Sequence, residues 1–254
     1  MTQTPFADWE PKLRAACDAT ALFRRVVALE QTASTQDADE TRAATVGTIV
    51  TAWRQTAGRG RFGRQWSDTA TQGLAVTAVI DAQPAERLVI AAAVAAAEAA
   101  ETALGARVGI KWPNDLFVAG RKLAGVLIEV RGGVALVGIG MNISQTSFEG
   151  ELESRATSLA MLGAHADRLA VLCTLVGALD RALTASDAWL VERFLERDAL
   201  RGTRALFATP AGPVEGEVRS VDPMRGLVVR TAMGEHFLPA QSTSVAEWAR
   251  PAAR

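Results

Sequence analysis

Residues 58–64, GRGRFGR, place three arginines and three glycines within seven positions. Three cations this close repel one another, and glycine increases the conformational entropy that is lost when a segment becomes ordered. Binding an anion would offset both costs. Arg59 and Arg61 can donate charge-assisted hydrogen bonds to phosphate or carboxylate oxygens, and the glycines let backbone amides approach a ligand. We therefore expect a flap that closes over an anion, with Phe62 and Trp66 as apolar side chains to bury.

Two common phosphate-binding motifs do not explain this segment. Gly58, Gly60 and Gly63 match the spacing G-x-G-x-x-G, but the dinucleotide fingerprint opens a helix, whereas here a loop leads back to the strand-like GLAVTAVI. No Gly-Lys-Ser/Thr ends the segment, which excludes a Walker A loop. A loop of solvated arginines is the alternative, although loops of this kind often carry binding residues.

Lysine is rare in this chain, and its few positions cluster. There are 24 arginines but only three lysines, Lys12, Lys111 and Lys122, and two of them lie within KWPNDLFVAGRK. A site can need a compact ammonium that a planar guanidinium cannot replace; chance clustering is the alternative. The Pro-Asn-Asp sequence at 113–115 is turn chemistry. We expect Lys111 to end one strand, Asp115 to begin the next, and Lys122 to open a third.

Glycine recurs on the strands that follow. Gly125 leaves room for a ligand against the backbone. Gly138, Gly140 and the polar Asn142 end a strand in VGIGMNIS. These positions join the flap and the lysines as candidates for one site.

The elements that must position these residues form an α+β pattern. Apolar periodicity predicts helices over residues 11–20, 35–44, 84–104, 167–183 and 187–200. Strands are expected over residues 23–30, 47–53, 73–80, 106–112, 115–118, 122–130 and 134–143. Gly132 and Gly133 predict a hairpin turn, and a second hairpin is expected around Gly120. Strands joined by hairpins favour a mixed sheet packed with helices over a repeated βαβ pattern.

The sequence changes character after about residue 200. Short strand-like segments separated by glycine and proline follow, with no helical pattern. This spacing is typical of a small β-barrel or sandwich. We expect a catalytic domain over residues 1–200 and a small β domain over residues 201–254.

Composition excludes several classes of protein. The formal net charge of −1 leaves no global basic field, so an anion site must be local, and nucleic acid is not expected as a partner. The most apolar run, residues 88–97, is too short to span a bilayer, and the N-terminus has no signal-peptide pattern. Cys17 and Cys173 lie far apart in sequence, which fits a reducing cytoplasm. His165 and His236 have no partners at metal-ligand spacing.

Five ordered motifs resemble the signatures of biotin–protein ligases, also called biotin–[acetyl-CoA-carboxylase] ligases. They are STQ at 34–36, QTAGRGRFGRQW at 55–66, KWPNDL at 111–116, RKLAG at 121–125 and GIGMN at 138–142. The small C-terminal β domain also suits this family. The resemblance implies a class II synthetase-like catalytic domain followed by an SH3-like barrel. It also implies that biotin and ATP, with Mg²⁺, form biotinyl-5′-adenylate, which then biotinylates one lysine of a carrier domain.

The resemblance also implies a set of site residues. The candidate catalytic residues are Lys122, Arg61, Lys111 and Asp115. The candidate residues for binding biotin and ATP are Ser34, Thr35, Gln36, Gln55, Gly58, Arg59, Gly60, Arg61, Trp66, Lys122, Gly125, Gly138, Gly140 and Asn142. No metal ligand is assigned.

Elementary chemistry agrees with these implied roles. The biotin carboxylate and the α-phosphate of ATP repel each other, and Lys122 with the flap arginines can neutralise both. The product is a mixed anhydride that water would destroy, so a closing flap would protect it. Hydroxyls and amides at Ser34, Thr35 and Gln55 suit the ureido ring of biotin. Asp115 is a candidate base or orienting group for the acceptor lysine.

The sequence also departs from the family pattern. Gln36 stands where the family often has asparagine, and Trp53 is a bulky residue near the flap without an evident role. Only about thirty residues precede the first motif, so we expect no helix-turn-helix repressor domain. A lipoate–protein ligase or octanoyltransferase and a nucleic-acid-binding module are the alternative functions. The strand at 134–143 is a candidate edge for pairing with a second copy of the chain or with the carrier domain.

Overall fold

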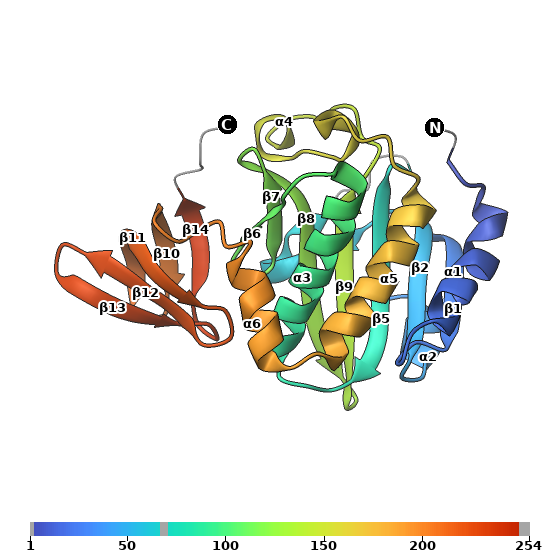
Figure 1. Ribbon diagram of the computed structural model, residues 1–254, viewed down its shortest axis with the longest axis horizontal. Helices are drawn as coiled ribbons and strands as arrows, with labels where there is room; N and C mark the ends of the chain where they lie inside the picture. The colour runs from blue at the N-terminus through green and yellow to red at the C-terminus, as the bar shows by residue number, and fades with distance from the viewer. Residues whose placement is uncertain (1–2, 67–70, 249–254) are drawn as a thin grey trace.

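The computed structural model describes residues 3–66 and 71–248. A seven-stranded sheet forms the centre of its larger part (Figure 1), in the spatial order β1-β2-β5-β9-β8-β7-β6. Strands β1 and β2 pair in parallel, and the other neighbours are antiparallel. The strands are β1 Arg25–Thr32, β2 Thr48–Gln55, β5 Gly73–Asp81, β6 Gly109–Lys111, β7 Asp115–Val118, β8 Arg121–Arg131 and β9 Val134–Asn142.

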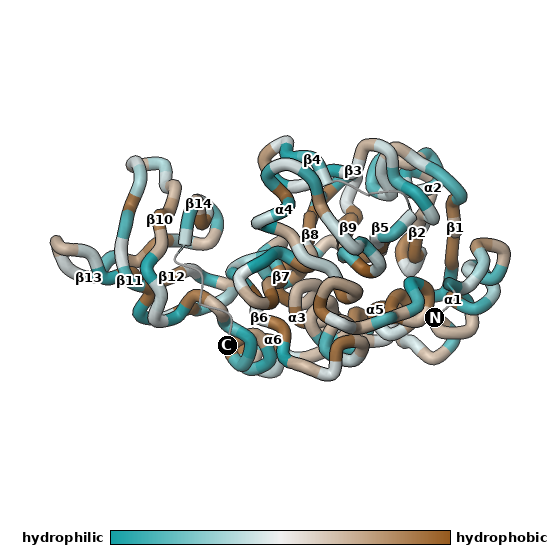
Figure 2. The backbone as a smooth tube through the Cα atoms, turned by 90° about the horizontal axis from the view of Figure 1, so that it is seen from above, coloured by the Kyte–Doolittle hydropathy of each residue, from teal (hydrophilic) through white to brown (hydrophobic). Residues whose placement is uncertain are grey.

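Helices cover one face of this sheet, and the flap lies on the other (Figure 2). The covering helices are α1 Trp9–Asp18, α3 Ala85–Leu104, α5 Arg168–Thr184 and α6 Asp187–Leu195. On the opposite face lie the short helix α2, Asp39–Ala43, and the hairpin of β3, Gly58–Arg59, and β4, Gln65–Trp66. Short helices α4 Leu152–Arg155, η1 Phe6–Asp8, η2 Arg61–Gly63 and η3 Ala160–Leu162 complete this part.

The long helix α3 shows how composition sets the layer spacing. Its buried residues are mostly alanine, so its backbone can lie close to the sheet and to its neighbours α5 and α6. It ends at Gly105, whose φ of 69° is the left-handed conformation that glycine adopts without strain. The expected helix over 84–104 is therefore confirmed.

The two expected hairpin turns are present. Gly132 and Gly133, between β8 and β9, have φ of 56° and 83°, which the antiparallel register of these strands requires. Ala119 and Gly120, between β7 and β8, have φ of 48° and 73°. These hairpins fix the order of the strands that carry KWPND, RKLAG and GIGMN.

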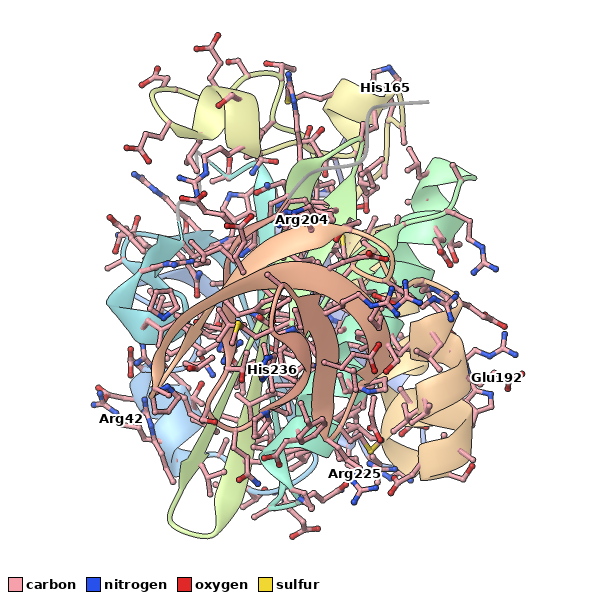
Figure 3. The ribbon with its side chains drawn as sticks, turned by 90° about the vertical axis from the view of Figure 1, so that its left-hand side faces the viewer. Arg42, His165, Glu192, Arg204, Arg225 and His236 are labelled. Carbon is pink, nitrogen blue, oxygen red and sulfur yellow. The ribbon has the colours of Figure 1, made fainter. Side chains whose placement is uncertain are left out.

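A second, five-stranded antiparallel sheet follows in the order β13-β12-β11-β10-β14. Its strands are β10 Arg204–Thr209, β11 Gly212–Asp222, β12 Gly226–Thr231, β13 Gly234–Pro239 and β14 Ser244–Trp248. Figure 3 views the molecule from this side and shows the sheet curved and barrel-like. Its buried residues Phe207, Val218 and Leu227 belong to the same hydrophobic core as those of the larger part. The domain boundary at residue 201 stays a prediction.

The structure corrects several expectations. The helix expected over 35–44 is only Asp39–Ala43, because residues 34–37 form a turn that lines the site. Helix α6 ends at Leu195 rather than near residue 200, since the chain then bridges to β6 at Ile110. Strand β14 was not foreseen. The strand at 134–143 is not an edge: β9 lies between β5 and β8, and the edges of this sheet are β1 and β6. Among the described residues, no helix is both long and apolar enough to cross a lipid bilayer.

Candidate active site

A cavity lies between the flap and the face of the sheet that the helices leave uncovered. Three parts of the molecule enclose it. They are the turn at 34–37, the flap (residues 58–66), and the middle of the sheet on strands β5, β8 and β9. Its lining residues are Ser34, Thr35, Gln36, Gln55, Arg59, Gly60, Arg61, Trp66, Ala75, Val76, Asn114, Lys122, Gly125, Val126, Leu127, Gly138, Ile139 and Gly140.

Glycines on β9 make space for side chains above the sheet. Gly138 and Gly140 are two positions apart and therefore face the same side. A Cβ on Gly138 would lie 2.8 Å from the side-chain amide carbon of Gln36, and one on Gly140 would lie 2.6 Å from the Trp66 indole. Across the ladder, Gly138 is paired with Leu127 and Gly140 with Gly125. The glycine pattern thus admits Gln36 and the flap tryptophan.

One end of the cavity, which we call the inner end, is lined by the uncharged polar side chains of Ser34, Thr35 and Gln55. The Gln55 Oε1 accepts a hydrogen bond from the Thr35 amide at 2.7 Å, and the Thr77 hydroxyl lies 2.9 Å from the Thr35 hydroxyl. Ser34 and Thr35 are 4% and 3% exposed. Preorganised hydroxyl and amide groups at this end suit a neutral ligand group that both donates and accepts hydrogen bonds.

The other end of the cavity is cationic. The Lys122 Nζ lies 2.6 Å from the Asp115 Oδ1 and 5.7 Å from the centre of the Trp66 ring. Asn114 donates from Nδ2 to the Asp115 carboxylate at 3.2 Å, and its Oδ1 accepts from Arg61 Nη1 at 2.9 Å. Arg61, Asn114, Asp115 and Lys122 therefore form one connected chain that joins the flap to β7 and β8.

Arg61 brings a poorly compensated charge to this end. Burial lowers the pKa of its guanidinium, the nearby Asp115 offsets part of this effect, and Arg64 adds to it. The group nevertheless stays protonated, because an arginine pKa lies far above neutrality. A partly buried cation whose hydrogen-bond partner is a neutral amide gains stabilisation when an anion enters the cavity.

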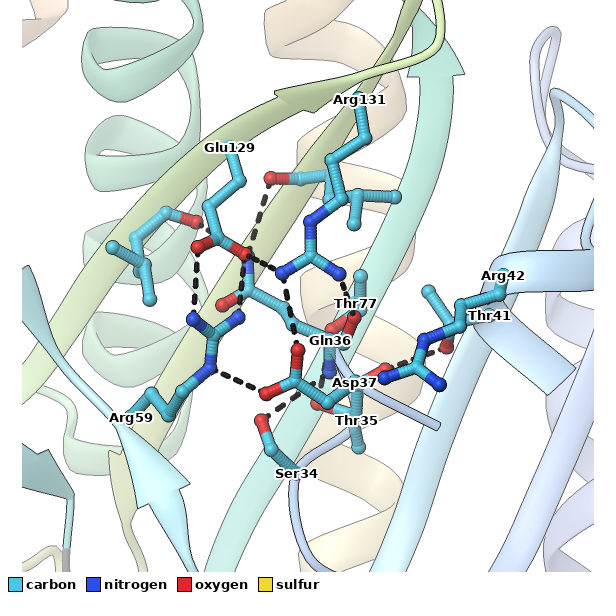
Figure 4. Close-up of polar contacts among 12 residues, drawn as sticks. Ser34, Thr35, Gln36, Asp37, Thr41, Arg42, Arg59, Thr77, Glu129 and Arg131 are labelled. Carbon is cyan, nitrogen blue, oxygen red and sulfur yellow. Dashed lines mark hydrogen bonds and ion pairs between the residues drawn. The ribbon is translucent and has the colours of Figure 1, made fainter. Parts of the chain in front are cut away.

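Arg59 also lines the cavity, but its guanidinium points away to two carboxylates (Figure 4). Its Nη1 and Nη2 donate to Glu129 at 2.9 and 2.6 Å, and its Nε lies 2.6 Å from Asp37. The hydrogen bonds to Glu129 are the main cause of a raised Arg59 pKa. In this conformation the charge of Arg59 is already neutralised.

Four predicted residues lie beside the cavity rather than in its wall. A Cβ on Gly58 would lie 2.8 Å from the Gln55 Nε2, so this glycine supports the inner end. Asn142 is buried and donates to the Thr157 carbonyl at 2.9 Å. The Asp115 Oδ1 lies 2.6 Å from the Lys122 Nζ. The Lys111 Nζ lies 5.7 Å from the centre of the Phe117 ring. Their roles stay predictions.

Sequence reasoning missed several residues of the site. Asn114 had been assigned only to a turn, although it belongs to the KWPND motif. Ala75, Val76, Val126, Leu127 and Ile139 line the cavity, and the alternation of their strands could have placed some of them. Asp37, Glu129 and Arg131 carried no local signal.

Within residues 3–66 and 71–248, no group of three or more histidine, cysteine, aspartate or glutamate side chains could hold a metal ion. His165 and His236 lie in separate parts of the molecule (Figure 3). Magnesium in nucleotide sites is usually bound by one or two carboxylates together with substrate phosphates. Asp115, beside Lys122, is the carboxylate that fits such a role.

Comparisons with known proteins point in one direction. A model of the biotin/lipoate A/B protein ligase family matches residues 26–145. A biotin–[acetyl-CoA-carboxylase] ligase of Mycobacterium tuberculosis is 32% identical over 217 residues, which cover 79% of this chain and 81% of that protein. The bifunctional ligase/repressor BirA of Bacillus spizizenii is 38% identical over 138 residues, and the match covers 42% of that protein, less than half its length.

Solved structures agree with these relatives. A biotin protein ligase from Aquifex aeolicus, in complex with biotin and ATP, superposes with a TM-score of 0.78 and 26% identity, covering 89% of this chain and 100% of that one.

Proposed function

The chain belongs to the biotin protein ligase family, and from that premise we propose that it activates biotin with ATP and transfers the biotinyl group to a lysine of a carrier protein. The observation that carries the proposal is the two-ended cavity. Its inner end offers uncharged hydrogen-bonding groups, and its outer end gathers Lys122 and Arg61. This arrangement suits a ligand with a polar neutral head and a terminal carboxylate.

In the first step, a carboxylate oxygen of biotin attacks the α-phosphorus of ATP. The bond from that phosphorus to the bridging oxygen breaks, and pyrophosphate leaves with the electron pair. Lys122 and Arg61 reduce the repulsion between the two anions and stabilise the charge that develops on the phosphoryl oxygens. Holding both reactants in one cavity supplies proximity. Magnesium, entering with the phosphates of ATP, would neutralise further charge.

In the second step, an uncharged lysine amine of the carrier attacks the acyl carbon, AMP leaves, and the amine nitrogen loses a proton as the amide forms. Asp115 is ion-paired with Lys122 at 2.6 Å, which favours a role in orienting the ammonium over one as general base. Trp66 and the flap cover the cavity and would keep water from the mixed anhydride.

We also propose a protein partner and a location for the enzyme. The acceptor is a biotin carboxyl carrier domain of an acetyl-CoA or acyl-CoA carboxylase, and such substrates place the enzyme in the cytoplasm. A homodimer stays a prediction, and we propose no particular strand as its interface. A nucleic-acid-binding role and a membrane role are not part of the proposal.

The test is exchange of labelled pyrophosphate into ATP, measured without an acid and with either biotin or lipoate. We expect stimulation by biotin alone. Stimulation by lipoate alone would favour the lipoate–protein ligase alternative, and absence of exchange with either acid would count against acid activation. Subsequent addition of a carrier domain should yield one biotinylated lysine, identified by mass spectrometry.

A further inference from the structure

Four charged residues form a closed ring of ion pairs at the edge of the cavity (Figure 4). Arg59 contacts Asp37 and Glu129, both at 2.6 Å. Arg131 closes the ring, with contacts to Asp37 at 3.0 Å and to Glu129 at 2.8 Å. Charges alternate around the ring, so that each cation meets two carboxylates and the net charge is zero.

The ring joins the three segments that enclose the cavity. Asp37 is the last residue of the turn at 34–37, Arg59 belongs to the flap, and Glu129 and Arg131 lie on β8. The two β8 residues continue the face on which Leu127 lines the cavity, because side chains two positions apart share a face. Arg131 also donates to the Gln36 carbonyl at 3.3 Å. No other set of described ion pairs connects all three segments.

Outside the ring, the described residues of the flap meet the rest of the protein through Trp66, which lies against Gly140 and Lys122, and through the tip. Its hairpin is only two residues long on each side. Among the residues that the structure describes, one side-chain hydrogen bond, from Arg61 to Asn114, ties its tip to the residue that precedes β7. Phe62 at the tip is 71% exposed. The side chains of the ring are between 24% and 39% exposed, so each pair alone would contribute little. The two-pronged Arg59–Glu129 contact and the closed circuit make this set stronger than isolated surface pairs.

We propose that this ring holds the flap over the inner end of the cavity before ligand binds, which makes Asp37, Arg59, Glu129 and Arg131 positioning residues for capture of the acid substrate. Arg59 then serves as an attachment point of the flap, and Arg61 is the flap cation that meets the substrate. A flap that is already ordered lowers the entropic cost of binding. The inference rests on the proposed function for its kinetic consequence.

The kinetic test compares Arg59→Gln, Glu129→Gln and the double variant with the wild type in biotin-dependent pyrophosphate exchange. Each single change should raise the KM for biotin about five- to tenfold and leave kcat within about twofold. Both changes break the same ring. The KM of the double variant should therefore be no higher than that of the single variant with the larger effect. Arg59→Lys, which keeps the charge but not the fork, should be intermediate. The matched control is Arg64→Gln, since Arg64 is an exposed flap arginine outside the cavity lining.

The second measurement needs no substrate. Amide hydrogen exchange at residues 58–60 of the ligand-free protein should accelerate in Arg59→Gln and Glu129→Gln but not in Arg64→Gln. Unchanged protection in the two ring variants would overturn the proposal. A decrease in kcat without a change in KM would also overturn it, as would a double variant in which the two increases in KM multiply. Either result would indicate that Arg59 contacts the reacting groups directly. If biotin stimulates no exchange in the wild type, the proposed function fails, and hydrogen exchange still decides whether the ring holds the flap.

Discussion

Lys122 occupies a position that accepts an ammonium more readily than a guanidinium. Its Nζ pairs with Asp115 at 2.6 Å, and the indole of Trp66 lies above it. The absence of a side chain at Gly125 is what gives it room, since a Cβ there would lie 3.1 Å from the Nζ. A planar, wider group would have to displace one of these neighbours. The use of lysine rather than arginine at position 122 therefore has a structural reason.

Replacement of Lys122 by arginine should lower the rate of biotin-dependent pyrophosphate exchange by roughly a hundredfold or more, because a preorganised positive group at the reacting oxygens is lost. Lys12→Arg is the matched control: Lys12 is an exposed residue of α1 paired with Asp8 at 3.1 Å, and that variant should keep wild-type exchange. Near-normal turnover in Lys122→Arg would contradict the role assigned to the ammonium.

Arg61 should retain the activated intermediate. In Arg61→Gln the partly buried cation is lost, and we expect biotinyl-adenylate to leave the enzyme about tenfold faster or more. The measurement is the appearance of free adenylate in the absence of acceptor, together with labelling of an unrelated added protein. Arg64→Gln should release adenylate at the wild-type rate. Equal retention in both variants would remove Arg61 from the site.

Trp53, which the sequence left without a role, belongs to the support of the site. It lies against Trp9 with ring centres 5.2 Å apart, and the buried Arg168 guanidinium lies 4.6 Å from its ring. Arg168 also donates to the carbonyls of Trp53 and Gly73, each at 2.7 Å. It thus bridges β2 and β5 just beyond their last paired residues, Ala52 and Ala75. This bridge fixes the end of β2 that carries Gln55.

At the scale of elements, the glycines of β9 act as spacers for the flap. Gly140→Ala should displace the Trp66 indole, because the added Cβ would lie 2.6 Å from it. Overpacking of this kind costs roughly 1–3 kcal/mol. If that cost falls on the closed flap, the KM for biotin should rise about five- to 150-fold. Gly177→Ala on α5 is the control, since its nearest neighbour is 3.7 Å away. That change should stabilise the helix by about 0.5–1 kcal/mol without affecting biotin.

The connection between α6 and β10 contains an acid whose pKa is raised by burial, Asp198. The folded state therefore favours its protonated form, and its contribution to stability is lost as pH rises through the raised pKa. Asp198→Asn imitates the protonated acid and can still accept from the Leu200 amide, now 2.9 Å from Oδ1. We expect it to unfold at higher urea concentration than the wild type near neutral pH, with no difference at acid pH. Asp39→Asn, at an exposed position, should show no such gain.

At the scale of the whole molecule, the C-terminal sheet is attached next to the KWPND segment. The Trp112 Nε1 donates to the Pro223 carbonyl at 2.8 Å, and Phe117 on β7 meets Trp248 edge to face at 5.4 Å. Trp112 is 1% exposed. The same short segment thus carries Lys111 and Asp115 and also contacts the second sheet.

Trp112→Phe should lower the free energy of unfolding by roughly 1–3 kcal/mol, because the Pro223 carbonyl loses its buried donor. Urea denaturation followed by circular dichroism measures this effect. Trp189→Phe on α6, where the side chain is only partly buried, should cost less. If Trp112→Phe unfolds like the wild type, the hydrogen bond does not contribute to the attachment of the second sheet.

The sequence alone determined the local features of this protein. Periodicity located α3, α5 and strands β5, β8 and β9, because the spacing of apolar residues along a helix or strand is a local property of the sequence. The paired glycines at 132–133 predicted the hairpin, because few other residues adopt a positive φ. The ordered motifs identified most of the residues that line the cavity.

Only the tertiary structure decided what meets across distant segments. It placed β9 in the middle of the sheet rather than at an edge. It paired Arg59 with Asp37 and Glu129, 22 and 70 positions away, instead of leaving its charge to a ligand. It also gave Trp53 its partner Arg168. Such pairings depend on how the whole chain packs. A short stretch of sequence does not reveal which distant charges folding brings together.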